Sequence, residues 1–372
     1  MSPFPHAPAR RTWAEIDPAA VIHNFRAIQT VVGSRVGVIA VVKANAYGHG
    51  LECVAPALAP HAKMFGVANV VEAHAVRAFA PDHPVLLLGP ALPDERADVV
   101  ASGFIPMVSS VEEAAAYSSL SRLQPTPVHV KLDTGMGRIG VWHGEALAVV
   151  REIAALHGVA ITGLASHLPS ADDDDVFTSV QLATFHRRAA ELREHGLPDV
   201  PLHIENSAGA IGFPEQAGDL VRVGLALYGS SPRAEFQSQL RPALAWKTRI
   251  ALVRDVQAGR SISYGRTFTT PHAMRIATLA VGYADGYQRH LSNVGAEVLI
   301  RGRRCAVLGR VTMDQILADV TALDAIAVGD EAVLIGRQGD EEITAAELAK
   351  KAGTIPWEIF TGLGPRVERV IA

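Results

Sequence analysis

Cysteine is almost absent from this sequence, with two residues among 372, and no uncharged apolar stretch is long enough to cross a bilayer. Cys53 and Cys305 lie far apart in ordinary apolar surroundings. This excludes a disulfide framework and a CxxC metal pair, and it favours a reducing compartment. Residues 1–10 lack the apolar segment of a secretory signal. We therefore expect a soluble, cytoplasmic protein with no membrane partner.

Charged residues are also few. They make up 19% of the sequence, and the formal net charge of −4 leaves no basic excess for binding nucleic acid. The 15 histidines form no HExxH motif and no Cys/His quartet, so we expect no metal site. Apolar residues are abundant, at 49%, over a length that suits two domains or one large domain with an appendage.

Short apolar runs alternate with segments of helical spacing from residue 17 to about residue 230. Runs that are apolar on both faces and separated by helices indicate a buried parallel sheet. Eight such repeats match a (β/α)8 barrel better than a doubly wound sheet, and we assign this barrel to residues 1–245. The predicted strands are 38–42, 64–68, 84–88, 104–108, 128–132, 161–166, 202–205 and 220–223, and the clearest helices are 111–123, 145–156 and 180–195.

The pattern changes after about residue 245, where apolar runs follow one another with only turns such as Gln338-Gly339-Asp340 between them. We therefore predict a second, mostly-β domain over residues 246–372, with one helix at 344–351. A strand near residues 11–17 could also join this second domain. The predicted strands are 246–256, 273–281, 297–300, 305–311, 315–320 and 331–334.

The stretch from Val41 to Gly50 carries the most information. An apolar run ends at Lys43, and Gly48 and Gly50 interrupt the chain before the next helical pattern. A buried ammonium is costly to desolvate. One interpretation is that Lys43 extends from a strand end into water. The other is that Lys43 binds a carbonyl cofactor through a Schiff base, because desolvation lowers the pKa of a lysine enough to make it a nucleophile.

Polar residues and glycines follow four further predicted strands at the same end of the barrel, where barrel enzymes place their functional loops. They are Asp133, Gly135, Gly137 and Arg138 after the fifth strand, His167 after the sixth, Asn206 and Ser207 after the seventh, and 222–224 at the eighth. The Ser207 hydroxyl and close backbone approach at Gly224 suit a phosphate. Together with Lys43, they describe a pocket for pyridoxal phosphate, which needs a lysine, a phosphate anchor and a partner for its ring nitrogen.

Arg222 is the candidate partner for that ring nitrogen. A guanidinium donates hydrogen bonds but cannot accept them, so the ring would remain unprotonated and be a weaker electron sink. Such a ring favours removal and return of one proton, and it suits decarboxylation poorly.

The stretch from Gly135 to Gly140 fits the GxGxxG dinucleotide fingerprint. It follows the fifth strand rather than the first, however, and the next helical pattern starts only near Glu145. We therefore assign no dinucleotide site.

Several long motifs, in the same order, closely resemble the alanine racemase family over nearly the whole chain. The matching stretches are 11–17, 42–50, 131–138, 166–167, 203–207, 221–225, 263–265, 281–286 and 309–315. The resemblance implies a fold-type III pyridoxal-phosphate enzyme with an N-terminal barrel and a C-terminal β domain. It also implies a head-to-tail homodimer with shared active sites and a small amino acid as substrate.

The resemblance implies roles for individual residues. Lys43 would bind the cofactor and act as one base, and Tyr264 from the other subunit would act as the second base in racemisation of L- and D-alanine, supplying D-alanine for peptidoglycan. Arg222 would hold the pyridine nitrogen beside His167. The other implied positions are Tyr47, Asn206, Ser207, Gly224 and Leu225 for the cofactor, Arg138, Tyr283 and Met313 for the substrate, and Lys131 for carbamylation.

Trp357 departs from the family pattern. It lies in the stretch Thr354–Glu358, where relatives commonly have a tyrosine that reaches the phosphate. Indole donates one hydrogen bond but is larger and lacks a phenol oxygen. We keep Trp357 as a cofactor-binding candidate, and it leaves open a broad-specificity or serine-preferring racemase. A non-catalytic pyridoxal-phosphate carrier is a further alternative, against which the second domain and Tyr264 argue.

Overall fold

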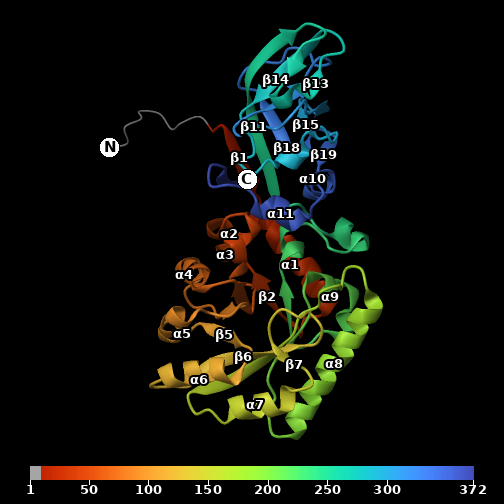
Figure 1. Cartoon of the computed structure of the whole chain (residues 1–372). Coiled ribbons are helices and arrows are strands. Elements are labelled where there is room, and N and C mark those ends of the chain that lie inside the picture. Colours follow the sequence, from red (N-terminus) through yellow and green to blue (C-terminus); the bar gives the residue numbers. More distant parts are fainter. Residues whose placement is uncertain (1–9) are drawn as a thin grey trace, which may run out of the picture. The chain divides into compact units, whose positions relative to one another are not determined.

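The computed structural model describes residues 10–372, which form two compact units (Figure 1). The barrel unit comprises Ala19–Tyr47 and Val54–Arg241. The β unit comprises residues 10–18, Gly48–Cys53 and Pro242–Ala372. The stretch that follows Lys43 is therefore divided between the two units at Tyr47 and Gly48.

Eight parallel strands form a nearly closed barrel in the order β10-β2-β3-β4-β5-β6-β8-β9. Between β9 and β10, the Arg222 N–H donates to the Glu205 carbonyl at 2.9 Å. This architecture confirms the predicted (β/α)8 barrel. The strands are β2 (Gly37–Val41), β3 (Met64–Val67), β4 (Val85–Leu87), β5 (Ile105–Val108), β6 (Thr126–Asp133), β8 (Val159–Ala165), β9 (Leu202–His203) and β10 (Leu220–Val223), with β7 (Val141–Trp142) paired to β6.

Apolar side chains from several of these strands pack together in the barrel. One core cluster combines Ile39, Leu86, Met107, Ala165 and Leu220, each at most 5% exposed. Full burial of a large aliphatic side chain contributes about 1.5–3 kcal/mol, so the continuous apolar runs of the sequence stabilise strands that are covered on both faces.

Helices surround these strands, and polar caps fix where several of them begin (Figure 1). Asn69, Ser110 and Asp174 each accept a hydrogen bond from the backbone N–H three residues further on, an arrangement that contributes about 1 kcal/mol per helix. The Asp174 cap starts the predicted helix 180–195 earlier than its apolar pattern does. The helices are α1 (Pro18–Val32), α3 (Leu51–Leu58), α4 (Val70–Phe79), α5 (Arg96–Ala101), α6 (Val111–Leu120), α7 (Ala146–Ala154), α8 (Asp175–Glu194) and α9 (Ser207–Gly212).

The β unit contains a mostly antiparallel sheet in the order β16-β15-β18-β11-β1-β20. Strand β1 (Thr12–Ile16) pairs antiparallel with β11 (Leu244–Val256) and parallel with β20 (Glu368–Ile371), so the strand near residues 11–17 lies in this sheet. The fold class, a barrel plus a mostly-β domain, is therefore confirmed. The other elements are β14 (Met274–Leu279), β15 (Glu297–Ile300), β16 (Arg303–Ala306), β17 (Ile316–Asp319), β18 (Glu331–Gln338) and α10 (Ala345–Ala352).

Four short strands and one helix of this unit had no counterpart in the predicted pattern. They are β12 (Ser261–Ile262), β13 (Phe268–Thr269), β19 (Glu341–Ile343), β20 and α11 (Pro356–Thr361). Within residues 10–372, no helix is long and apolar enough to cross a membrane. In the same range, no group of His, Cys, Asp and Glu side chains is arranged to hold a metal ion.

Candidate active site

Lys43 begins a left-handed turn directly after β2. The short element α2 (Lys43–Tyr47) contains this turn. The φ angles are 52° at Ala44, 53° at Asn45 and 53° at Ala46, with similar ψ angles, and φ is 51° at Tyr47. Each non-glycine residue in this conformation costs about 1–2 kcal/mol. Strain of this size persists only where surrounding contacts impose it, and such positions cluster at functional sites.

Glu72 is one of the contacts that hold this turn. Its carboxylate accepts hydrogen bonds from the N–H groups of Ala44 at 2.7 Å and Ala68 at 2.8 Å. Burial lowers the pKa of Lys43, and the charges of Arg138 and Arg222 lower it further, while Glu72 opposes the shift. The environment therefore favours the neutral, nucleophilic form of the Lys43 amine.

A cavity of about 300 Å³ at the carboxyl ends of the barrel strands brings five predicted site residues together. Lys43, Lys131, Arg138, His167 and Arg222 all line it. Apolar walls come from neighbouring strand ends, including Leu88 and Met107. An apolar cavity with a few convergent polar groups and perturbed pKa values is the usual form of a small-molecule site.

Arg222 is buried at the centre of a hydrogen-bond network. Its guanidinium donates to the carbonyls of Ser166 at 2.7 Å, His203 at 2.9 Å and Ile204 at 2.9 Å. Its nitrogens also lie 2.7 Å from His203 Nδ1 and 3.0 Å from His167 Nδ1. Because a guanidinium only donates, both Nδ1 atoms must accept, and each ring carries its proton on Nε2.

His129 continues the network beyond His203. His203 Nε2 lies 2.8 Å from His129 Nδ1, so the Nε2–H of His203 donates to His129. Burial, with the charge of Arg222, lowers the pKa of His129 to about 4 and the pKa values of His167 and His203 well below their usual value. Arg222 therefore keeps its charge beside three neutral imidazoles whose tautomers it sets.

A tight cradle is formed by Tyr47, Ser207, Gly224 and Leu225. Ser207 Oγ accepts from the Gly224 N–H at 3.0 Å, and a Cβ at Gly224 would lie 2.5 Å from Tyr47 Oη. The Tyr47 ring stacks on Tyr228 with 4.9 Å between centroids. Burial raises the pKa of Tyr47 to about 12, so its phenol remains a neutral donor. Leu225 is buried at the start of the following turn.

Asn206 acts on the backbone beside this cradle. Its Oδ1 accepts from the Gly209 N–H at 3.0 Å, and its Nδ2 donates to the Leu168 carbonyl at 3.0 Å. The side chain thus caps α9 and fixes where Ser207 begins that helix.

The loop that carries Arg138 is closed by Asp133. The Asp133 carboxylate accepts from the N–H groups of Gly135, Met136 and Gly137 at 2.8–2.9 Å. The GxGxxG stretch therefore folds back on an aspartate and leads into β7, and the next helix begins only at Ala146. This geometry agrees with assigning no dinucleotide site.

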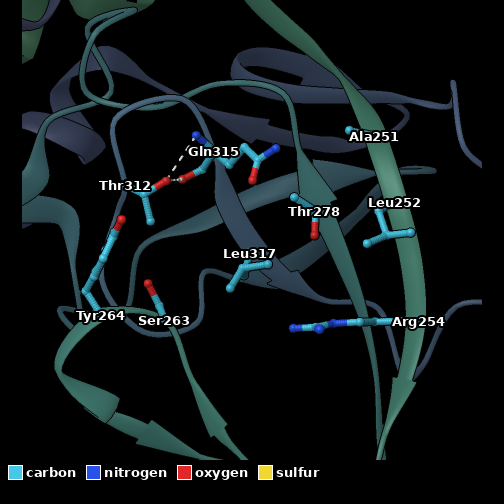
Figure 2. Close-up of a pocket in the computed structure, with 9 residues that line it drawn as sticks. All are labelled: Ala251, Leu252, Arg254, Ser263, Tyr264, Thr278, Thr312, Gln315 and Leu317. Atoms are coloured by element: carbon cyan, nitrogen blue, oxygen red, sulfur yellow. Dashed lines mark hydrogen bonds between the residues drawn. The ribbon is translucent and has the colours of Figure 1, made fainter.

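The remaining predicted residues belong to the β unit. Tyr264, Tyr283 and Met313 have exposed side chains, at 71%, 41% and 52%. The Tyr283 N–H donates to the Thr312 carbonyl at 3.0 Å, so Tyr283 and Met313 lie on paired loops. Trp357 is half-buried in α11. Tyr264 lines a hollow of about 570 Å³ with Thr312 and Gln315 (Figure 2).

Both halves of the chain match one family. Residues 16–232 match the model of the alanine racemase N-terminal domain, and residues 243–371 match that of the C-terminal domain. The chain belongs to the alanine racemase family. A curated alanine racemase of Symbiobacterium thermophilum is 45% identical over 366 residues, covering 97% of each chain.

Solved structures of this family agree with the fold. Alanine racemase from Bartonella henselae, described with covalently bound pyridoxal phosphate, is 31% identical with a TM-score of 0.89, covering 98% of this chain and 100% of the other. Alanine racemase from Bacillus anthracis, described with bound L-Ala-P, is 35% identical with a TM-score of 0.89, covering 97% and 95%.

Sequence reasoning missed four residues that support the site. Glu72 holds the Lys43 turn, Tyr228 supports Tyr47, and His129 and His203 extend the Arg222 network. The pattern Asn69-x-x-Glu72 resembles a helix start and could have directed attention to Glu72. Tyr228 and His129 are ordinary core residues by sequence pattern, and His203 begins the matching stretch 203–207 but had no role assigned; only their contacts reveal one.

Proposed function

We propose that this protein racemises alanine with pyridoxal phosphate, using Lys43 and Tyr264 as two bases, and that it supplies D-alanine for peptidoglycan. The observation that carries the proposal is the cavity that Lys43, with its lowered pKa, shares with the buried guanidinium of Arg222 and with Arg138. Membership of the alanine racemase family supports the same reaction.

The residues present fit pyridoxal phosphate. Lys43 offers an amine that burial makes nucleophilic, and Arg222 offers a charged donor for the ring nitrogen. Tyr47, Ser207, Gly224 and Leu225 would hold the phosphate, because the Tyr47 phenol and the Ser207 hydroxyl both lie against the Gly224 backbone, where a Cβ would clash with Tyr47. Asn206 would fix the start of α9, and His167 and Trp357 would contribute further contacts. The cofactor supplies an electron sink that makes the α-proton of a bound amino acid acidic.

Racemisation then needs one proton acceptor and one proton donor on opposite faces of the substrate. Lys43 would exchange a proton at Nζ on one face, and the phenol of Tyr264 would do so on the other. The exposed Tyr264 side chain suits a contribution from a partner subunit in a head-to-tail homodimer, with Tyr283 and Met313 from the same subunit contacting the substrate. Arg138 would orient the carboxylate of the substrate.

The test is incubation of the purified protein with L-amino acids and a chiral readout. We expect alanine to be racemised most efficiently, and no D-alanine formation with the cofactor present would reject the proposal. A preference for serine would instead support the alternative raised by Trp357. Release of carbon dioxide would indicate a decarboxylase, which a cationic Arg222 at the ring nitrogen disfavours.

We further propose that Lys131 is carbamylated. Its Nζ is buried, has no hydrogen-bond partner among residues 10–372, and has a pKa that burial and Arg222 lower well below the usual value. A neutral amine forms a bond to the carbon of CO2 and releases one proton, and the resulting anion would pair with Arg138. We expect a carbamate ¹³C NMR signal in ¹³C-bicarbonate that Lys131→Ala abolishes and Lys63→Ala retains. Its absence in the unaltered protein would contradict the assignment.

Replacing Gly224 by alanine should weaken cofactor binding. The new methyl group would overlap the Tyr47 phenol, and forced overpacking costs about 1–3 kcal/mol. We therefore expect the Kd for pyridoxal phosphate to rise about tenfold to a hundredfold in fluorescence titrations of the apoprotein. Gly144→Ala, where a Cβ meets only ordinary contacts at 3.4 Å, is the control. Equal affinities for the two variants would contradict the cradle.

A further inference from the structure

Ser263, which precedes Tyr264, has a backbone conformation that is essentially restricted to glycine. Its φ is 62° and its ψ is −175°. A Cβ in this region meets unfavourable contacts, so a non-glycine residue stays there only when its surroundings impose it. Gly265 and Arg266 also have positive φ, at 71° and 54°. Tyr264 therefore projects from a strained turn.

The surroundings that impose this conformation are visible around the turn. Ser263 Oγ donates to the Arg310 carbonyl at 2.6 Å. A Cβ on Gly309 would lie 3.0 Å from Ser263 Cβ, so the segment carrying Arg310 packs directly against Ser263. Ile262, 2% exposed, anchors the turn in a core cluster with Met274 and Ile276.

The Tyr264 side chain, by contrast, has few contacts within its own chain. It is 71% exposed, and within residues 10–372 its phenol has no hydrogen-bond partner. Figure 2 shows Tyr264 and Ser263 at one edge of the hollow, with Thr312 beside the phenol. When packing does not orient a side chain, its direction depends on the backbone that carries it.

We propose that Ser263 is a positioning residue, whose strained backbone and hydrogen bond to the Arg310 carbonyl aim the Tyr264 phenol for proton transfer. This inference rests on the proposed role of Tyr264 as the second base. The two substitutions differ in the strain: alanine keeps the strain and removes only the hydrogen bond, whereas glycine removes both the strain and the hydrogen bond.

Thermal unfolding tests the strain. Alanine is ordinarily more stable than glycine within regular structure. Here we expect the reverse order, with the Tm of Ser263→Ala below that of Ser263→Gly by about 2–4 °C. A Tm for Ser263→Ala equal to or above that of Ser263→Gly would overturn the argument from strain.

A double-mutant cycle tests whether Ser263 acts through Tyr264. We expect Ser263→Ala to lower kcat at least about tenfold with little change in KM, and to have no further effect in a Tyr264→Phe background. The exchange of the α-hydrogen of alanine for deuterium can be followed by NMR in D₂O. In Ser263→Ala, we expect the exchange rate to remain high for the enantiomer whose proton Lys43 removes and to fall for the enantiomer whose proton Tyr264 removes. A merely structural role would slow both enantiomers equally.

Ala325→Gly is the matched control, because Ala325 also has positive φ, at 49°, but lies on an exposed turn outside the hollow. We expect its kinetics to be unchanged. If Tyr264→Phe slows racemisation but Ser263→Ala does not, or if the two effects are additive, the positioning role is overturned while the proposed function stands. If Tyr264→Phe itself changes nothing, the two-base proposal fails and this inference fails with it.

Discussion

Replacement of Lys43 by alanine is expected to abolish alanine racemisation, lowering kcat/KM by at least about 10³-fold. The change removes both the amine that would bind the cofactor and one of the two proposed bases. We expect that borohydride reduction of the loaded protein, followed by mass spectrometry, will attach pyridoxal phosphate to Lys43 in the unaltered chain and not in the variant. Chiral chromatography of alanine measures the loss of turnover.

Lys63→Ala is the control for this experiment, because Lys63 is an exposed lysine of the barrel unit that does not line the cavity. It should keep its turnover and its covalent cofactor. Near-normal racemisation by Lys43→Ala would contradict the proposed function. The left-handed turn at Ala44–Ala46 would then have to serve another purpose.

Arg222→Lys is expected to have the second largest effect, on stability as well as on activity. The guanidinium contacts five hydrogen-bond acceptors, four of them in buried pairs, and an ammonium with three donors on a single nitrogen cannot replace it. Each buried acceptor left unsatisfied costs about 1–3 kcal/mol, so we expect the free energy of unfolding to fall by about 3–5 kcal/mol. Urea denaturation of the apoprotein measures this loss.

The activity of Arg222→Lys should also fall, by at least about tenfold, because the variant no longer fixes the acceptor nitrogens of His167 and His203 or presents the same donor to the ring. Arg233→Lys is the control. Arg233 is another largely buried arginine of the barrel unit, which donates to the Ala171 carbonyl at 2.9 Å and does not line the cavity. We expect Arg233→Lys to lose stability but to keep its turnover per folded molecule, and equal losses of turnover would contradict a specific role for Arg222.

The barrel could be predicted because its strands are covered on both faces. Such strands appear in the sequence as continuous apolar runs, and β2 and β10 lie within one residue of their predicted bounds. Strand β9 is shorter than predicted, because Asn206 caps α9 and the chain turns into that helix. Helix α8 begins earlier than its apolar pattern because Asp174 caps it.

The short strands of the β unit could not be predicted in this way. Strand β20 exists because it pairs with β1, and the register joins Ile16 to Ile371 across almost the whole chain. Strands β12 and β13 have two residues each, too few to show a period. Their pairing places Tyr264 on the turn between them.

The alternation of apolar runs and helices could be recognised in the sequence alone, as could Lys43 at a strand end, with arginine, histidine, serine and glycine after other strands. These features are local, since burial on both faces and the chemistry of one residue type can be recognised within a few residues. How those groups act depends on contacts between distant parts of the chain. Residues distant in sequence hold Ala44–Ala46 left-handed, orient the histidines around Arg222 and keep Ser263 in a glycine conformation. Non-glycine residues intrinsically disfavour these backbone conformations, and only packing between distant segments overcomes that preference.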